Sequence, residues 1–564
     1  MTNPTSTPHA AAAIAYAEGV KDGSILACKW ARLACARFLR DLRRAKRPSF
    51  AYSFDQAKAE RVCRFIELLP HVKGKWARPD PSTHQPQTIK LEPWQCFILC
   101  NIFGWIRRAT GLRRFRSASV YVPRKNAKST LAAAIGWWML AKDDEPGAEV
   151  YSGATTEHQA WEVFGPALQM AKAVPAMPKG LGVTVNAGSL IKESDNSRFL
   201  PIIGKPGDGA SPHCAIVDEY HEHPTSDLYD TMQTGMGARE QPLILVISTA
   251  GSDLKGPCRE DWKTCEAILN GTIKDETHFG IIYTLDEGDD WTTETALRKA
   301  NPNFDVSVSG DFLRDQLSKA KRDPRSQGTF KTKHLNQWVT AKYGYFNVQR
   351  WHELENKNLK REDFAGQPCI LAGDFGNKRD LTDLVMLFPR GDGKFAVFCN
   401  HYIPRDTVDE PQHQHYQAWE RGKWLTVTEG SVMDPDRIYD DAEQILKIHG
   451  VIEMPIDPNR AWGMVPEFQR RSLPVVEYRL TVLMMSEPMK FLDALMQSGR
   501  IEHNGDPVLA WAIGNVTAKE DVKGNVYPNK EGEENKIDPA VALIMAVGRA
   551  MTQTETVEAG ILMA

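Results

Sequence analysis

The sequence predicts an α/β protein with two successive mixed regions behind an N-terminal helical segment. Strand-like and helix-like runs alternate between residues 117 and 250, and a second mixed region begins near residue 351. Such alternation is typical of sheets whose loops at the carboxyl ends of the strands carry the chemistry. Residues 9–46 have helical periodicity instead, and they end in a basic helix terminus before a proline.

The expected elements follow one another in a simple order. Two helical segments, 9–46 and 54–72, precede an apolar helix that Pro93 opens. A polar, helical stretch between 300 and 350 is expected to connect the two mixed regions. The expected strands are 117–122, 148–154, 214–220, 243–250, 368–376, 384–389 and 395–404, with helices from 129, from 157 and over 539–553.

Composition narrows the possible classes of protein. The chain has 564 residues, of which 42% are hydrophobic and 25% charged, as in a globular protein of several domains. No uncharged apolar run reaches the length of a membrane span, and the start lacks the basic region of a secretory signal. Ten cysteines without a CxxC pair predict neither a disulfide framework nor a zinc site, which favours a reducing, cytosolic compartment.

Three basic clusters are candidates for contacts with nucleic-acid phosphates, although the net charge is −3. Averaging over the chain can hide such patches. The alternative for each cluster is a solvated helix end or loop. The clusters are residues 43–47, 107–116 and 319–325.

The stretch YVPRKNAKST, residues 121–130, has the residue spacing of a phosphate-binding loop but lacks its glycines. Lys128 and Ser129 stand where the pattern G-x-x-x-x-G-K-[ST] has its lysine and hydroxyl, but Val122 and Ala127 replace the glycines. The loop lies between an expected strand and an expected helix, where backbone N–H groups wrap phosphates. The alternative is a chance Lys-Ser pair in front of a helix.

Three further stretches strengthen the phosphate-loop hypothesis. Asp218 and Glu219 end an apolar strand, where an aspartate holds Mg²⁺ and a glutamate polarises the attacking water. Ser248 and Thr249 end the next apolar strand, where small hydroxyl residues can sense a γ-phosphate. Gln95, upstream, could read an adenine edge with both its donor and its acceptor. The alternative for the first pair is an ordinary strand that ends in two acids.

This order of motifs resembles the large terminase subunit of tailed bacteriophages. The matching segments are L-x-x-W-Q, P-R-K-N-x-K-S, an apolar strand followed by D-E, and an apolar strand followed by S-T-A-G. Arg124 matches an arginine that this family often has early in the loop, whereas Ala127 departs from the usual glycine. The segments 154–160 and 333–339 also look like family segments, with no settled role.

The resemblance implies a P-loop ASCE-type ATPase domain followed by an RNase H-like α/β nuclease domain. The implied domains are an N-terminal helical region (1–90), the ATPase domain (91–300), a helical connector (301–350) and the nuclease domain (351–564). Glu219 would be catalytic, and Ser129 and Asp218 would hold the Mg²⁺ of ATP. The implied ATP-binding residues are Gln95, Arg124, Lys125, Asn126, Ala127, Lys128, Ser129, Thr130, Asp218, Ser248 and Thr249.

Separated carboxylates are the candidate nuclease site that the resemblance implies. Asp374 and Asp457 end apolar strands, and Asp538 starts the last helix. Two Mg²⁺ or Mn²⁺ ions held by such acids can align a water and stabilise the leaving oxygen. Asp538 could instead be a helix N-cap, which leaves the third ligand open. The further candidates are Asp380, which could alternatively pair with Arg379 or Lys378, together with Asp383 and Asp434.

The histidines give no metal signature. His221 and His223 follow the Asp218–Glu219 strand and are expected to be loop residues, and His503 is expected to end a strand. No HExxH or similar zinc spacing is present. Arg239, in front of the second apolar strand, is a candidate arginine finger, against a surface or salt-bridge role.

The resemblance implies an ATP-driven motor that translocates double-stranded viral DNA into a procapsid and an endonuclease that cuts concatemeric DNA. The implied partners are DNA, the portal protein, the small terminase subunit and further copies in a homo-oligomeric ring, with no membrane. The implied location is the cytoplasm of the infected host, outside the mature virion. Two alternatives remain: another P-loop DNA translocase or helicase with a nuclease domain, and a non-catalytic assembly protein.

Overall fold

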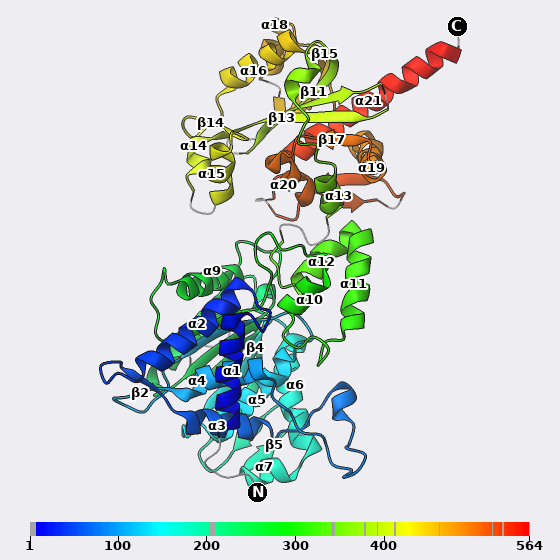
Figure 1. The fold of residues 1–564 in the computed structure, drawn as a ribbon. Coiled ribbons are helices and arrows are strands. Elements are labelled where there is room, and N and C mark those ends of the chain that lie inside the picture. The colour runs from blue at the N-terminus through cyan, green and yellow to red at the C-terminus, as the bar shows by residue number, and fades with distance from the viewer. Residues whose placement is uncertain are drawn as a thin grey trace. The chain divides into compact units, whose positions relative to one another are not determined.

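The fold comes from a computed structural model and is shown in Figure 1. The structure describes residues 7–203, 209–339, 344–376, 380–391, 393–410, 413–461, 463–521, 523–532 and 535–562. The chain forms two compact units. The first comprises Met1–Lys319 and Thr329–Val339, and the second comprises Ala320–Gly328 and Thr340–Ala564. The domain boundaries expected at residues 90, 300 and 350 stay predictions.

Helices open the first unit, as predicted. α1 (Pro8–Asp22) ends at Gly23, whose φ of 86° is a left-handed conformation that glycine adopts without strain. α3 (Gln56–Ile66) begins after Asp55, whose side chain accepts a hydrogen bond from the Lys58 amide. α4 (Pro93–Gly104) begins at the expected proline. The remaining elements are α2 (Lys29–Arg44), the 3₁₀ turn η1 (Gly74–Ala77), and β1 (Tyr52–Phe54) paired with β2 (Trp105–Arg107).

An eight-stranded sheet forms the centre of the first unit, in the order β10-β3-β9-β8-β4-β7-β6-β5. The strands from β10 to β7 run parallel, and β6 and β5 are antiparallel. Four strands are confirmed: β3 (Ser117–Tyr121), β4 (Glu149–Ala154), β8 (Cys214–Asp218) and β9 (Leu243–Ser248). The sequence did not predict β5 (Val183–Val185), β6 (Leu190–Lys192), β7 (Ser197–Ile203) and β10 (His278–Ile282).

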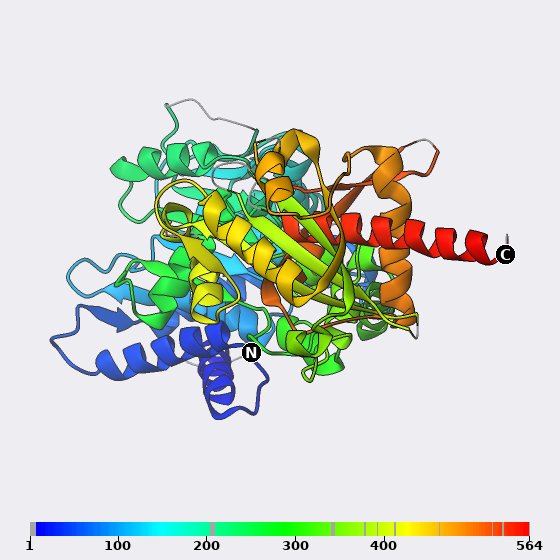
Figure 2. The same cartoon turned by 90° about the horizontal axis from the view of Figure 1, so that it is seen from above.

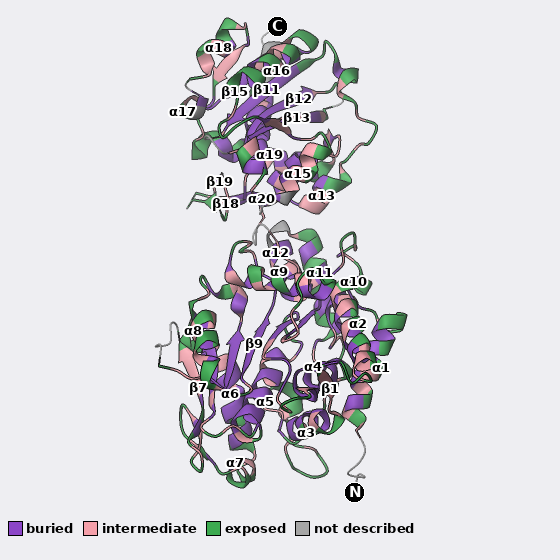
Figure 3. Cartoon of the chain, turned by 90° about the vertical axis from the view of Figure 1, so that its left-hand side faces the viewer, coloured by how far each residue is buried: buried purple, intermediate pink, exposed green. Residues whose placement is uncertain are grey.

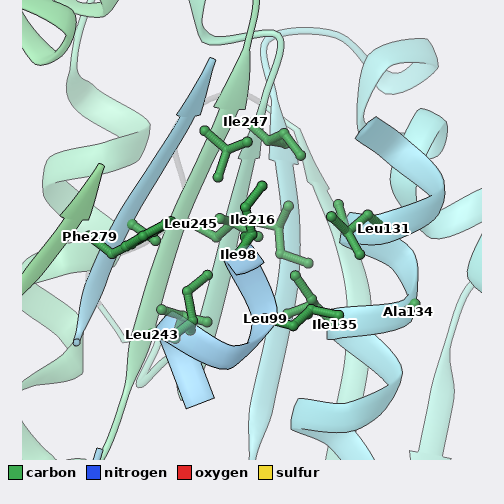
Figure 4. Packing of buried hydrophobic residues seen from close by; sticks show 14 of the residues in the cluster. Ile98, Leu99, Leu131, Ala134, Ile135, Ile216, Leu243, Leu245, Ile247 and Phe279 are labelled. Carbon is green, nitrogen blue, oxygen red and sulfur yellow. The ribbon is translucent and has the colours of Figure 1, made fainter. Parts of the chain in front are cut away.

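The core of the first unit lies between this sheet and its helices. Figure 4 shows Ile98 and Leu99 of α4, together with Leu131 and Ile135 of α5 (Lys128–Ala141), packed toward the strands around Ile216. Every residue of β8 and β9 is buried, and Figure 3 shows the strands in purple and the outer helices largely in green. The loops at the strand ends are therefore held on a rigid base.

The other helices of the first unit follow the sheet strands in the chain. They are α6 (Glu157–Ala173), α7 (Ala176–Gly180), α8 (Asp227–Gly235), α9 (Pro257–Asn270), α10 (Glu294–Ala300), α11 (Gly310–Arg322) and α12 (Pro324–His334), with the 3₁₀ turns η2 (Tyr220–Glu222) and η3 (Met236–Ala238). The helical character expected between 300 and 350 is seen in α11 and α12.

The second unit is built on another mixed sheet, in the order β14-β13-β12-β11-β15-β16, with β17 also paired to β13. β12 is antiparallel to its neighbours β11 and β13, whereas β15 runs parallel to β11. The strands are β11 (Pro368–Phe375), β12 (Thr382–Pro389), β13 (Phe395–Pro404), β14 (Thr426–Thr428), β15 (Gly450–Ile456), β16 (Val475–Glu477) and β17 (Ile501–His503), and a separate hairpin joins β18 (Thr517–Glu520) and β19 (Val526–Asn529).

The last helix, α21 (Asp538–Leu562), packs against β11 and β12. In Figure 2 it begins beside the strands of the second sheet and extends beyond them in red. Its start therefore lies near the ends of the strands that carry the predicted acids. The other helices are α13 (Val348–Glu353), η4 (Arg361–Phe364), α14 (Arg405–Val408), α15 (Gln414–Arg421), α16 (Pro435–Ile448), α17 (Pro458–Ala461), α18 (Val465–Arg470), α19 (Val482–Ser498) and α20 (Pro507–Asn515).

All ten cysteines are free thiols, and nine of them are buried. Across the described ranges, no helix is both long enough and apolar enough to cross a membrane.

Candidate active sites

The loop between β3 and α5 adopts the conformation of a phosphate-binding loop without using glycine. Ala127, directly before Lys128, has a φ of 60°, and Lys125 has a φ of 70°. Each left-handed residue other than glycine costs about 1–2 kcal/mol, so the surroundings must hold this loop in place. With Ala127 in place of glycine, the loop therefore keeps the same backbone path and the backbone of Ala127 is strained.

Asn126 is one of the residues that stabilise this loop conformation. Its Nδ2 donates to Asn301 Oδ1 at 2.8 Å, and its Oδ1 accepts from the Asn303 amide at 3.0 Å. Ser307 Oγ adds a bond to the Lys125 carbonyl at 2.7 Å. The buried side chain of Asn126 thus fastens the loop to residues 301–307, which leaves only its backbone for the predicted nucleotide contact.

Lys128 is the best-defined cation of this site. Its side chain is only 5% exposed, and its Nζ has no hydrogen-bond partner among the described residues. The closest carboxylate is that of Glu219, with Oε1 3.7 Å from Nζ. A buried ammonium without hydrogen bonds is costly, so this position suits an anion that accepts from Nζ.

The acids of β8 face the loop from the neighbouring part of the sheet. Ser129 Oγ lies 3.5 Å from Asp218 Oδ2, and the Glu219 amide donates to Asp218 Oδ1 at 2.9 Å. Burial, and then the charge of Glu219, raise the pKa of Asp218 to about 7. Burial opposes ionisation of Glu219 too, but Lys128 and then His221 outweigh it and lower the pKa of Glu219. The predicted hydroxyl and acid pair therefore do come together.

The predicted sensor residues Ser248 and Thr249 contact a histidine that the sequence did not single out. His221 Nδ1 lies 3.0 Å from Ser248 Oγ, 3.4 Å from Thr249 Oγ1 and 3.2 Å from Glu219 Oε2. His221 lies in the turn η2 after β8, as expected, but its ring is 3% exposed and lies between two of the motifs. A histidine two residues after an acid pair was the only available sequence signal.

Gln95 lies at a pocket of about 1010 Å³ that Lys125, Ala127 and Thr130 also line. Its Oε1 accepts from the Glu92 amide at 3.0 Å in a capping box at the start of α4. This bond fixes the orientation of the amide and leaves Nε2 as the donor that can face a base. The capping bond uses one of the two lone pairs of Oε1, so the expected contact of Gln95 with an adenine edge stays a prediction.

Several arginines of the first unit bind protein groups and do not form an exposed basic surface. Arg239, the candidate arginine finger, donates to the carbonyls of Ser211 and Gly147, which favours the structural alternative. In the cluster 107–116, Arg114 is fully buried and is paired with Asp41, and Arg113 is buried against Asp143. These two arginines stabilise the first unit and are not available to DNA phosphates.

The predicted nuclease acids occupy neighbouring strand ends of the second unit. Asp374 is paired in register with Asp383, and Asp383 with His401, so the three side chains share one face of the sheet. Asp457 directly follows β15, which is parallel to β11, and Gly373 pairs with Ile456, the residue before Asp457. Asp538 is the first residue of α21.

Asp383 is a further acid of this region, and the charge of Asp538 affects its pKa. It is fully buried, and burial, together with smaller effects that include the charge of Asp538, raises the pKa of Asp383 to about 7. Its Oδ1 lies 2.5 Å from His401 Nδ1, and His401 Nε2 lies 2.9 Å from Asp506 Oδ2. Asp383 Oδ2 has no hydrogen-bond partner among the described residues. The sequence did not identify His401 or Asp506 as support for this acid.

The other two open candidates have local partners. Asp380 is paired with Lys536, and the alternative partners Lys378 and Arg379 lie outside the described residues. Asp434 is the N-cap of α16 and accepts from the Asp436 amide at 3.0 Å. His503 ends β17, as expected, and stacks on Trp351.

The set of acids fits hard divalent cations. Asp374, Asp383, Asp457 and Asp538 are all buried, and His401 lies next to Asp383. Buried carboxylates that share a site repel one another unless a cation lies between them. Oxygen ligands of this kind suit Mg²⁺ or Mn²⁺.

Comparison with known proteins places these sites in a family. Residues 93–267 match the terminase large subunit ATPase domain, and residues 272–554 match the terminase large subunit endonuclease domain. The chain is 47% identical over 361 residues to protein YmfN of Escherichia coli (strain K12), which covers 62% of this chain and 79% of YmfN. It is 28% identical over 515 residues to the large terminase subunit of Enterobacteria phage HK97, which covers 87% and 95% of the two chains. The crystal structure of the HK97 bacteriophage large terminase aligns with a TM-score of 0.43 and 26% identity, over 87% of this chain and 99% of that chain.

Both candidate sites lie inside the matched segments. Lys128 and Glu219 fall in the ATPase segment, and Asp374 and Asp538 fall in the endonuclease segment. This order favours a packaging enzyme over a helicase or a non-catalytic assembly protein. The chain belongs to the terminase large subunit family, in which an ATPase and an endonuclease on one chain serve the packaging of phage DNA.

Proposed function

We propose that the loop around Lys128 binds the phosphates of ATP and that Glu219 orients the water that attacks the γ-phosphate. The observation that carries this proposal is the buried Lys128 Nζ without a hydrogen-bond partner among the described residues, 3.7 Å from the Glu219 carboxylate. Phosphate oxygens would accept from this ammonium and from the backbone N–H groups at the start of α5. The low pKa of Glu219 keeps its carboxylate ionised to accept a proton from water.

Mg²⁺ held by Ser129 and Asp218 would supply charge neutralisation on the phosphates. The pocket beside Gln95 is large enough for the base and ribose, because ligand pockets of this kind are about 300–1,000 Å³. Lys125 and Thr130 line the same pocket, and the Arg124 amide of the loop donates to the Lys333 carbonyl. Ser248 and Thr249 act on the γ-phosphate indirectly in this proposal, through His221.

In the second unit, Asp374, Asp457 and Asp538 would hold two Mg²⁺ or Mn²⁺ ions, which would supply Lewis-acid activation of a water and charge stabilisation for DNA cleavage. Asp383 is proposed as a fourth carboxylate of this site. The support is its buried Oδ2 without a partner among the described residues and its electrostatic contact with Asp538. Asp380 and Asp434 are less suitable, because each already has a partner in the fold.

The motor would work as a ring of copies on the portal protein of the procapsid, together with the small terminase subunit. Its substrate would be double-stranded DNA in the cytoplasm of the infected host, and the protein would not remain in the mature virion. Membership of the family supports this proposal of partners and location. Exposed basic residues of the clusters 43–47 and 319–325 would contact phosphates without reading bases, as translocation requires.

ATP turnover by Lys128→Ala tests the ATP site. Loss of the ammonium should lower phosphate release by at least about 100-fold, while DNA cleavage continues. Lys142→Ala, at the opposite end of α5, is the matched control and should hydrolyse ATP like the wild type. Normal turnover by Lys128→Ala would remove the basis for this assignment.

A further inference from the structure

A segment outside the matched ATPase residues is built into the ATPase site. Lys333, near the end of α12, has a carbonyl that accepts from the Arg124 amide of the phosphate loop at 2.8 Å. Three residues later, Asn336 Oδ1 accepts from the Ala250 amide at 2.6 Å, next to Ser248 and Thr249. The segment 333–339 therefore contacts both the phosphate loop and the end of β9.

The side chain of Lys333 reaches the acid of the site through His221. Lys333 is 7% exposed, and its Nζ lies 2.6 Å from His221 Nε2. Glu222 Oε1 lies 3.2 Å from the same nitrogen. An ammonium only donates hydrogen bonds, so Lys333 favours the neutral imidazole in which Nε2 accepts and Nδ1 carries the proton. That Nδ1–H lies 3.2 Å from Glu219 Oε2 and 3.0 Å from Ser248 Oγ.

The order of atoms is thus Lys333 Nζ, His221 Nε2, His221 Nδ1 and Glu219 Oε2. Lys333 favours the tautomer of His221 that carries its proton on Nδ1, and this nitrogen lies close to both Ser248 Oγ and one oxygen of Glu219. The other oxygen, Oε1, lies 3.7 Å from Lys128 Nζ. His221 Nδ1 and Lys128 Nζ are therefore close to different oxygens of the Glu219 carboxylate, and Oε2 has no hydrogen-bond partner of its own among the described residues.

We propose that Lys333 is a positioning residue for ATP hydrolysis, which acts through His221 to orient the Glu219 carboxylate toward the attacking water. The inference rests on the proposed role of Glu219. It makes the hydrolytic step, and not nucleotide binding, depend on the segment 333–339. The chain runs on from this segment into the second unit, so the ATPase step depends on the stretch of chain that leads to the endonuclease.

The test is steady-state ATP hydrolysis and nucleotide affinity of full-length Lys333→Met. Loss of the ammonium should lower kcat by about 10- to 100-fold, as for other residues that orient a catalytic group, with the Kd for a non-hydrolysable ATP analogue within about threefold of wild type. Lys333→Arg, which keeps a donor, should restore part of kcat. The matched control is Lys331→Met, two residues earlier on α12, where Nζ lies over the Trp291 ring; it should turn over like the wild type.

His221→Ala provides an independent check. If Lys333 acts only through His221, then the double variant Lys333→Met/His221→Ala should be no slower than His221→Ala alone. Unchanged kcat in Lys333→Met, equal loss in Lys331→Met, or loss of nucleotide affinity in step with kcat would each overturn the inference. The variant Glu219→Gln distinguishes failure of this inference from failure of the proposed function. Normal ATP hydrolysis by Glu219→Gln would refute the role of Glu219 itself. Loss of hydrolysis in Glu219→Gln, together with normal hydrolysis in Lys333→Met, would refute only the role of Lys333.

Discussion

The two active sites use similar strand ends but differ in their buried charges. In the first unit, Lys128 and Lys333 are buried close to Glu219, and the site contains an ammonium nitrogen, Lys128 Nζ, without a hydrogen-bond partner among the described residues, beside one such oxygen of Glu219. In the second unit, Asp383 is buried among other acids, and the corresponding atom is a carboxylate oxygen.

This difference indicates what each site is built to receive. A buried ammonium lacks an anion, which phosphate oxygens provide, and a buried carboxylate lacks a cation, which Mg²⁺ or Mn²⁺ provides. Similar strand ends thus support two chemistries, because the residues that follow the strands differ. The following variants test this difference between the two sites.

The largest effect is expected at the nuclease acids. Asp457→Asn and Asp538→Asn each remove a charge from the metal site while they keep the side-chain volume, so plasmid cleavage in Mg²⁺ or Mn²⁺ should fall by at least about 100-fold. Asp434→Asn, at the N-cap of α16, is the control that should cleave normally. If Asp538→Asn cleaves like the wild type, Asp538 is only a helix-terminal residue and the contrast fails there.

A smaller effect is expected from Asp383→Asn on metal affinity. Its Mn²⁺ affinity, measured by calorimetry without nucleotide, should weaken by about 10- to 100-fold, while Asp380→Asn, whose native partner is Lys536, should bind normally.

The Mn²⁺ affinity of the second unit should also depend on pH. Burial raises the pKa of Asp383 to about 7, so below that pH a proton must leave before the carboxylate ligates a metal. Wild-type Mn²⁺ affinity should therefore fall by up to about tenfold per pH unit below 7, and this slope should be shallower in Asp383→Asn. Equal slopes in the two proteins would show that Asp383 does not bind the ion.

The smallest effect concerns the phosphate loop. Ala127→Gly should stabilise the first unit by about 1 kcal/mol, because glycine adopts the left-handed conformation without strain. Ala132→Gly, inside α5, should destabilise it by about 1 kcal/mol or more, because glycine is unfavourable within a helix. Thermal unfolding measures both, and destabilisation by Ala127→Gly would show that the loop is not strained.

The sequence was sufficient for the parts of each site that lie at the ends of apolar strands. Lys128, Ser129, Asp218 and Glu219 could be predicted to meet, because carboxyl ends of parallel strands share one edge of a sheet. The same holds for Asp374 and Asp457. Buried strands such as β8 and β9 give continuous apolar runs, which are easy to recognise.

The supporting residues could not be predicted, because their partners are distant in sequence. Lys333 and His221 are separated by 112 residues, and Asp506 and His401 by 105. A single histidine or lysine in a polar stretch has no periodicity that reveals a buried contact. For the basic cluster 107–116 the prediction of exposed charges was misleading, because Tyr52 and Asp41, which contact Arg114, are far from it in the chain.

Parallel assays of Lys128→Ala and Asp374→Asn test the central claim most directly, namely that one chain carries two chemically separate active sites. Phosphate release and DNA cleavage should be measured on both full-length variants and on the wild type. Lys128→Ala should lose ATP hydrolysis and keep cleavage, and Asp374→Asn should lose cleavage by at least about 100-fold and keep ATP hydrolysis. Loss of both activities in either variant, or of neither, would contradict the assignment of two independent sites.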